Sequence, residues 1–295
     1  LSLCFRLAFV KNRNIYLVHS LCHPQTISVI KTRAKPLNIK IKLCDEFKEL
    51  DLKKSFGILF QYPDTFGHLS DLEDLINICH KNKTLVSVAT DLLSLALLKP
   101  PGEMDADVVL GSSQRFGTPL GFGGPHAAFF ATKNKFIRSM PGRIIGVTID
   151  KRKKNPYRMS LQTREQHIRR DRATSNICTA QVLLAIMASM YAVYHGPSKL
   201  RQIAERVNYL TSVLHSSLVS GVYRVNSSSF FDTIKVAKKD KKVIEKALKK
   251  KFNFWDYGDS IGISMDETVT NSDIRNLLDF FGVEWVEPVG SSTPS

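Results

Sequence analysis

The chain has 295 residues, of which 43% are hydrophobic and 23% are charged, so it can bury a core and is not an intrinsically disordered chain. Its formal net charge is +15, which would suit an acidic partner. The lysine-rich stretches have no interleaved aromatic residues and match no nucleic-acid-binding module, so we expect no nucleic-acid binding. The longest apolar stretch, residues 180–194, is broken by Gln181 and Ser189; it predicts a buried helix and no membrane span.

The five cysteines and eight histidines carry no metal-site spacing. There is no Cys-x-x-Cys pair and no His-Glu-x-x-His motif, and the cysteine count is odd. This pattern predicts a reducing compartment, without disulfides or a bound metal. The chain begins with Leu1, which indicates a fragment or a processed product with any targeting peptide upstream.

The first part of the chain alternates between apolar strand patterns and helical patterns. Strands without a polar face, separated by helices, predict a parallel sheet covered on both sides, which is α/β architecture. The expected strands are residues 14–19, 56–61, 85–89 and 107–110, and the expected helices are residues 23–34 and 69–81.

Polar residues follow three of these strands directly. Asp64 and Asp91 each come shortly after a strand, and residues 112–114 follow the next one. In a parallel sheet ligands bind beyond the carboxyl ends of the strands, so we expect these side chains to converge on one crevice. Single polar residues after strands are also common without any function.

A glycine-rich loop, residues 119–125, leads into an apolar run at 127–131. The structural interpretation is a tight turn that feeds a strand, and the functional one is a backbone that approaches a cofactor or a partner. No helix follows the loop, so neither a Rossmann fingerprint nor a P-loop fits.

Residues 162–172 are rich in arginine and histidine and precede a long helix expected at 177–194. They could form a solvated helix or an anion site. Residues 174–176, Thr-Ser-Asn, are candidate N-caps of the long helix, and side chains not used in capping could face the crevice.

Gly196 and Pro197 mark a change in the pattern, so a second unit of α+β type is expected from there on. Residues 230–233 and 262–267 are interpreted as strand ends and a helix entry, without chemistry. The expected helices of this unit are residues 200–218, 241–250 and 271–281, and its expected strands are residues 223–225, 230–236 and 261–265.

Longer motifs lie at residues 22–26, 60–65, 99–103, 111–130, 140–143, 161–181 and 191–197. Together they resemble the glycine cleavage system P-protein family, which is pyridoxal-phosphate-dependent glycine decarboxylase. The resemblance runs from about Leu3 to about Gly282 and corresponds to the amino-terminal half of that family's protein. It implies pyridoxal-phosphate fold type I, the aspartate-aminotransferase-like α/β fold with a mainly parallel sheet. The large domain would be residues 1–195, incomplete at its N-terminus, and the small α+β domain residues 196–295.

The most informative position in this resemblance is Gln114. In the family's carboxy-terminal half, a lysine within His-Lys-Thr-Phe holds the cofactor, and the aligned stretch here is Ser113-Gln114-Arg115-Phe116. Only an amine condenses with the cofactor aldehyde, so a carboxamide cannot hold it covalently. The resemblance therefore implies a lysine-bearing carboxy-terminal half or partner subunit that binds most of the pyridoxal phosphate. Asp91 corresponds by position to the aspartate that pairs with the cofactor's pyridine nitrogen.

The activity implied by the resemblance is that of glycine dehydrogenase (aminomethyl-transferring, decarboxylating), an oxidoreductase of glycine catabolism. Glycine would lose carbon dioxide, and its aminomethyl group would pass to the lipoyl group of H-protein. In this half we expect Asn176, Ser175, Arg164 and His167 as contacts for substrate or for the interface. The location would be the mitochondrial matrix in a eukaryote and the cytoplasm in a bacterium. The alternative is a catalytically silent structural or regulatory subunit, or a truncated inactive product.

Overall fold

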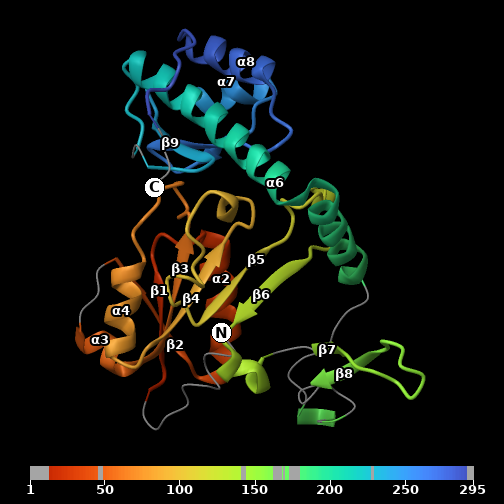
Figure 1. Cartoon of the computed structure of the whole chain (residues 1–295). Helices are drawn as coiled ribbons and strands as arrows, with labels where there is room; N and C mark the ends of the chain where they lie inside the picture. The colour runs from red at the N-terminus through yellow and green to blue at the C-terminus, as the bar shows by residue number, and fades with distance from the viewer. Residues whose placement is uncertain are drawn as a thin grey trace.

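The computed structural model describes residues 13–45, 49–140, 144–161, 168, 170–172, 180–226 and 229–290. Its main body is a six-stranded sheet with helices on both faces, and the chain then passes through a hairpin and a long helix to a second, three-stranded sheet (Figure 1).

The first group of elements builds the large sheet and its helices: β1 (Ile15–His19), α2 (Pro24–Ala34), β2 (Lys40–Cys44), α3 (Glu49–Lys54), β3 (Ser55–Tyr62), α4 (Glu73–Lys81), β4 (Leu85–Thr90), β5 (Val108–Ser112) and β6 (Ala128–Thr132). The second group follows: β7 (Ile144–Val147), β8 (Tyr157–Leu161), α6 (Ala180–Ser220), β9 (Thr233–Ala237), α7 (Val243–Lys249), β10 (Trp255–Asp256), β11 (Ser260–Ser264) and α8 (Asn271–Phe281). Short 3₁₀ turns lie at Lys35–Leu37, Ser94–Ala96, Gly121–Gly123, Asn134–Ser139 and Arg170–Arg172.

The strand order of the large sheet is β2-β1-β3-β4-β5-β6. All neighbouring pairs are parallel except β5 and β6, which are antiparallel. This confirms the predicted mainly parallel sheet and α/β class. The carboxyl ends of the parallel strands lie along one edge, and the residues that follow β3, β4 and β5 are therefore neighbours.

Both faces of the large sheet are buried at the central strands β1, β3 and β4, as the strands without a polar face predicted. Alternate residues of β1 separate onto the two faces: Tyr16 and Val18 belong to the core under α2, and Leu17 to the core under α4. Ala34 of α2 joins the first core, and Ile76 of α4 joins the second. The sheet is thus held by two layers of apolar packing that fix its strand ends.

The structure differs from the sequence prediction in several places. Elements β2, α3, β7, β8 and β10 were not predicted, and α4 begins at Glu73 instead of residue 69. The predicted strand at 223–225 is reduced to a single bridge between Val225 and Val236. The missed β2 is an edge strand in which Lys40 and Lys42 interrupt the apolar pattern that marks the central strands.

The prediction that residues 180–194 form a buried helix is wrong in one respect. They are helical, as the first part of α6, and the helix is interrupted at Gly196, which has a φ of 65°. However, six of its large apolar side chains are exposed: Val182, Leu183, Ile186, Met190, Val193 and Tyr194. The apolar composition indicates that this helix packs against another surface. It does not indicate that no part of the described chain provides that surface.

The three-stranded sheet, in the order β10-β11-β9, packs with the second part of α6 and with α8. Its buried side chains, such as Ile234 and Ile263, belong to the same apolar cluster as Phe60 and Val88 of the large sheet. The two sheets therefore share a continuous core. Among the described residues, no helix is long and apolar enough to cross a membrane.

Candidate functional site

The carboxyl edge of β4 and β5 is the part of the molecule where the fold gathers polar side chains. Gly111 allows the end of β5 to lie close to the end of β4, because a Cβ at this position would lie 2.0 Å from the Thr90 carbonyl oxygen. After β5 the chain forms a tight turn, in which the Phe116 amide donates to the Ser113 carbonyl and the Thr118 amide to that of Gln114. The turn holds Gln114 and Arg115 at the strand end.

The side chain of Arg115 meets three carboxylates there, a group that we call the Arg115 cluster. Its Nη1 lies 2.6 Å from Asp232 Oδ2 and 3.4 Å from Asp91 Oδ2. Its Nε lies 3.5 Å from Glu267 Oε2. The four side chains are only 13–26% exposed. The cluster thus joins the end of β4 to residues next to β9 and β11.

Charge in this cluster is strongly perturbed by its surroundings. Burial raises the pKa of Asp91 to about 6, although the Arg115 guanidinium opposes the rise. For Arg115, burial would lower the pKa, but the carboxylates of Asp232 and Asp91 outweigh it and raise the pKa. The guanidinium therefore stays charged, and Asp91 is a carboxylate that takes up a proton on mild acidification.

We expect Asp91→Asn to change the pH dependence of stability. The pKa of Asp91 is about 6 in the folded chain against a model value of 3.8. The unfolded chain therefore releases this proton first as pH rises, and the free energy of unfolding falls between about pH 4 and pH 6. Two pKa units correspond to about 3 kcal/mol, and the remaining exposure of Asp91 reduces this to about 2 kcal/mol.

Urea unfolding of the wild type and Asp91→Asn at pH 4 and pH 7 measures this difference directly. Asparagine keeps an oxygen for the Leu93 amide, which donates to Asp91 Oδ1 at 3.1 Å. The variant should lose less stability between the two pH values than the wild type. Equal losses would show that Asp91 is not titrating in this range.

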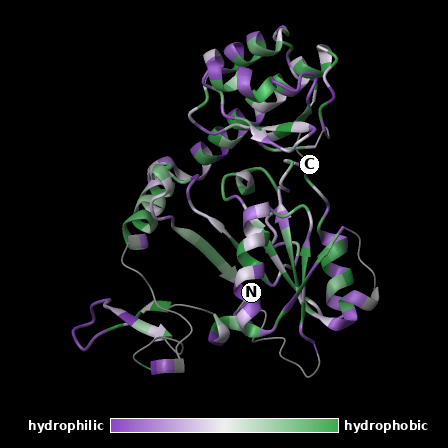
Figure 2. Ribbon diagram, turned by 180° about the vertical axis from the view of Figure 1, so that it is seen from behind, coloured by the Kyte–Doolittle hydropathy of each residue, from purple (hydrophilic) through white to green (hydrophobic). Residues whose placement is uncertain are grey.

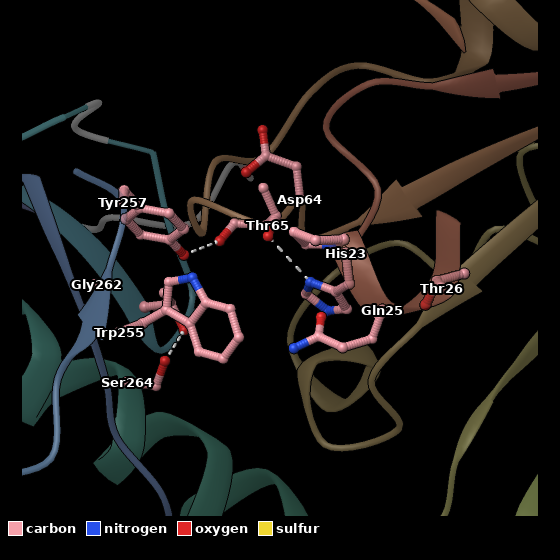
Figure 3. Close-up of a pocket in the computed structure, with 11 residues that line it drawn as sticks. His23, Gln25, Thr26, Asp64, Thr65, Trp255, Tyr257, Gly262 and Ser264 are labelled. Atoms are coloured by element: carbon pink, nitrogen blue, oxygen red, sulfur yellow. Dashed lines mark hydrogen bonds between the residues drawn. The ribbon is translucent and has the colours of Figure 1, made fainter. Parts of the chain in front are cut away.

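A cavity of about 450 Å³ lies between the N-terminus of α2 and the three-stranded sheet (Figure 3). Trp255 and Tyr257 form its aromatic wall on one side, and His23 and Thr65 lie on the other, with a 3.2 Å contact between His23 Nδ1 and Thr65 Oγ1. The Tyr257 hydroxyl donates to the Thr65 carbonyl at 2.6 Å. The described lining residues are His23, Pro24, Gln25, Thr26, Asp64, Thr65, Thr233, Trp255, Tyr257, Gly262 and Ser264.

The cavity and the Arg115 cluster adjoin each other through Thr233. Its hydroxyl donates to Asp232 Oδ1 at 2.9 Å and lies 2.8 Å from Ser264 Oγ. Asp64, which lines the cavity, accepts from the amides of Phe66 and His68. Burial raises its pKa, and these amides oppose the rise. The cavity therefore has an aromatic wall and a carboxylate, with no lysine or arginine among its described lining residues.

The sequence prediction of one crevice after the strands is met only in part. Asp91 and the turn that carries Gln114 meet in the Arg115 cluster, and Asp64 lies in the adjoining cavity. Asn176, Ser175, Arg164 and His167 lie outside the described residues. Within the described residues, no group of three or more His, Cys, Asp or Glu side chains could hold a metal ion.

Sequence reasoning missed Arg115, Asp232 and Glu267. The sequence predicts strand ends without chemistry at residues 230–233 and 262–267. In the structure, the carboxylates of Asp232 and Glu267 face Arg115, and Asp232 is 117 residues away from it in sequence. The strand-end rule that indicates Asp91 does not apply to them, because β9 and β11 pair antiparallel and Asp232 precedes its strand. The pairing itself is a tertiary contact that no local pattern contains.

Comparison with known proteins shows to which family the chain belongs. A family model described as glycine cleavage system P-protein matches residues 1–281. A glycine dehydrogenase (decarboxylating) from Aliivibrio fischeri strain MJ11 is 51% identical over 289 residues, 97% of this chain. One from Thermosynechococcus vestitus is 50% identical over 295 residues, 98% of this chain. The chain belongs to the glycine cleavage system P-protein family. It spans only 30% and 31% of the length of these two relatives, respectively.

Solved structures agree with this assignment. A glycine decarboxylase P-protein in inhibitor-bound form matches with a TM-score of 0.84 at 29% identity, covering 94% of this chain and 66% of that chain. An aspartate aminotransferase from Thermus thermophilus matches with a TM-score of 0.61 at 14% identity, covering 95% and 81%. The second likeness shows the fold alone, and it confirms pyridoxal-phosphate fold type I.

The described residues do not fit pyridoxal phosphate as a resident cofactor of this half. Gln114 has no amine for the aldehyde, and Asp91 already faces the guanidinium of Arg115. The adjoining cavity has no lysine or arginine among its described lining residues for a phosphate, and Asp64 would repel one. The described residues thus provide no amine for the aldehyde, no free carboxylate for the pyridine nitrogen and no basic side chain for the phosphate.

We therefore expect that Gln114→Lys will not by itself bind the cofactor covalently. The new amine would stand beside Arg115, without a free partner for the pyridine nitrogen and without a basic phosphate site. Borohydride reduction of the variant in the presence of pyridoxal phosphate, followed by peptide mapping, measures the outcome. A pyridoxyl group on residue 114 in high yield would contradict the poor fit.

Proposed function

We propose that this chain is the part of a glycine decarboxylase that does not hold the cofactor covalently. A lysine-bearing carboxy-terminal half or subunit would bind the pyridoxal phosphate, and the complex would decarboxylate glycine and pass the aminomethyl group to the lipoyl group of H-protein. The absence of an amine at Gln114 is the observation that supports this division of labour. The cofactor supplies the electron sink for decarboxylation.

The exposed apolar side chains support the need for a partner half. The six exposed residues in the first part of α6 form what we call the outer face of α6, defined above. The β7–β8 hairpin adds a second exposed group, the hairpin face, in which Ile145 is paired with Met159 and Val147 with Tyr157. Cross-strand pairing and alternation put these four side chains on one face.

The first part of α6 and the β7–β8 hairpin lie on the same side of the molecule, beyond β6 at the edge of the large sheet (Figures 1 and 2). Figure 2 shows a largely apolar helix there. A two-stranded hairpin with an exposed apolar face is marginal in water and is stabilised by burial against another surface. The lysine-bearing half of the same family would provide that surface and would bring its cofactor lysine close to the Gln114 edge.

Several finer assignments belong to the same proposal. Asn176, Ser175, Arg164 and His167 would contact glycine or line the interface. The large domain would end at residue 195 and the small domain begin at residue 196, near the interruption of α6 at Gly196. The location would be the mitochondrial matrix in a eukaryote or the cytoplasm in a bacterium.

Mixing tests the proposal. The chain is combined with a lysine-bearing carboxy-terminal half of the family, pyridoxal phosphate and lipoylated H-protein, and exchange of the glycine carboxyl with labelled bicarbonate is followed. We expect a complex by analytical ultracentrifugation and an exchange rate well above that of the partner half alone. A complex without any gain in rate would favour a silent structural subunit, and no complex at all would favour a truncated inactive product.

A further inference from the structure

The Arg115 cluster connects the two sheets of the molecule. Its members come from both sheets: Asp91 follows β4 of the large sheet, and Asp232 and Glu267 flank strands of the three-stranded sheet. Arg115 itself follows β5. A single guanidinium thus contacts carboxylates on both sides of the boundary between the sheets.

The surroundings hold this guanidinium in place. Its Cζ lies 6.0 Å from the centre of the Phe231 ring, and the turn after β5 is anchored by Phe116, whose ring lies 5.7 Å from that of Tyr191 in α6. Gly117 makes this packing possible, because a Cβ there would lie 2.7 Å from Tyr191 Cδ2. The position of Arg115 is therefore fixed by a turn whose side chains are packed against α6.

Charge balance explains why the arginine is needed. Three carboxylates converge on one cation, and their exposure is only 13–26%. Without Arg115 the carboxylates would repel each other in a region with little water. The Arg115 Nε and Nη2 atoms and Asp91 Oδ2 are buried without a conventional hydrogen bond among the described residues, so the cluster is held by charge more than by hydrogen-bond geometry.

We propose that Arg115 is a built-in counter-ion that takes the place of a cofactor at this edge and latches the three-stranded sheet onto the large sheet. It neutralises Asp91, which would otherwise be available to the protonated pyridine ring of the cofactor. It also links Asp91 to Asp232 and Glu267 through shared contacts with one guanidinium. The Arg115 cluster thereby holds the two sheets in one relative arrangement. This latch does not depend on the proposed glycine chemistry, because it concerns contacts within the chain alone.

Hydrogen exchange measured by mass spectrometry tests the latch in the purified chain. Reporter amides are Leu93, which donates to Asp91 Oδ1, and Met265, which donates to the Asp232 carbonyl at 2.8 Å. We expect Arg115→Met to speed exchange at both sites by about 100-fold, since an uncompensated carboxylate cluster favours local opening. Arg201→Met is the matched control, because Arg201 pairs with Glu205 on an exposed helix surface.

A double-mutant cycle distinguishes a latch from a general loss of stability. Asp232→Asn and Arg115→Met are measured alone and combined. If the two side chains act as a pair, the combined variant should exchange at least about 10-fold more slowly than the product of the single effects predicts. Effects that multiply, or an Arg115→Met variant that exchanges like the wild type, would overturn the proposal. Arg115→Lys should give an intermediate rate, which keeps the test valid if Arg115→Met does not fold.

A second measurement tests the replacement of the cofactor. Pyridoxal phosphate added to the wild-type chain should not change the exchange at Leu93. Protection of Leu93 by added pyridoxal phosphate would show that the aspartate is available to it, and the counter-ion role would fail even if the latch holds.

Discussion

Ile186→Asp is expected to weaken association with the lysine-bearing half by at least about 100-fold. Ile186 lies at the centre of the outer face of α6, one helical turn from both Val182 and Met190. If this face is covered in the complex, the substitution places an unpaired carboxylate in an apolar contact, which costs several kcal/mol. In the isolated chain the side chain is exposed, so stability should change little. Sedimentation equilibrium of the mixture measures the dissociation constant.

Leu248→Asp is the matched control for this variant. Leu248 is as exposed as the residues of the outer face, but it lies on α7, among the elements of the three-stranded sheet and away from β6. The control should bind the partner half like the wild type. Equal affinity of Ile186→Asp and the wild type would show that the outer face of α6 is not the contact surface.

Gly67→Ala is expected to lower the free energy of unfolding by about 3 kcal/mol or more. Gly67 has a φ of +84°, and a Cβ there would lie 1.9 Å from the Thr233 carbonyl oxygen, which is backbone of the three-stranded sheet. The neighbouring contacts are short: the Asn226 side chain donates to the Phe66 carbonyl at 2.8 Å, and His68 forms a bridge with Phe230. The added methyl group would separate the two sheets or strain the loop.

Gly258→Ala separates the effect of close packing from that of the backbone conformation. Gly258 has a similar φ of +90°, but nothing lies within 4 Å of the position of its Cβ. Its substitution should cost only about 1 kcal/mol. Denaturant unfolding of both variants gives the comparison. A cost for Gly67→Ala no greater than that for Gly258→Ala would mean that the sheets do not approach each other as closely at this point.

Local patterns predicted the elements whose signals are local. The central strands were evident because β3 and β4 have no polar face, and α8 was placed at Asn271–Phe281, the range that the structure gives. The structure shows why this helix is so well marked: Thr270 forms a capping box with Asp273, and Gly282 ends the helix in the left-handed conformation. Such signals lie within a few residues and need no tertiary contact.

The candidate site was harder to predict because its parts are brought together by the fold. The resemblance predicts Gln114 as the lysine-equivalent position, and the rule for strand ends indicates Asp91. That rule does not extend to Asp232 and Glu267, because they flank strands of an antiparallel sheet and their partner Arg115 lies more than 100 residues away. The exposure of α6 was missed for a different reason: apolar sequence shows that a surface must be covered, but not by which chain.

The most direct test of a half without a cofactor lysine is to locate the cofactor in the active complex. The chain is mixed with its lysine-bearing partner half and pyridoxal phosphate, the complex is reduced with borohydride, and both polypeptides are mapped by mass spectrometry. We expect a stoichiometric pyridoxyl group on the partner's lysine and no stoichiometric pyridoxyl group on this chain. A stoichiometric pyridoxyl group on any residue of this chain, or release of carbon dioxide from glycine by this chain alone, would contradict the account.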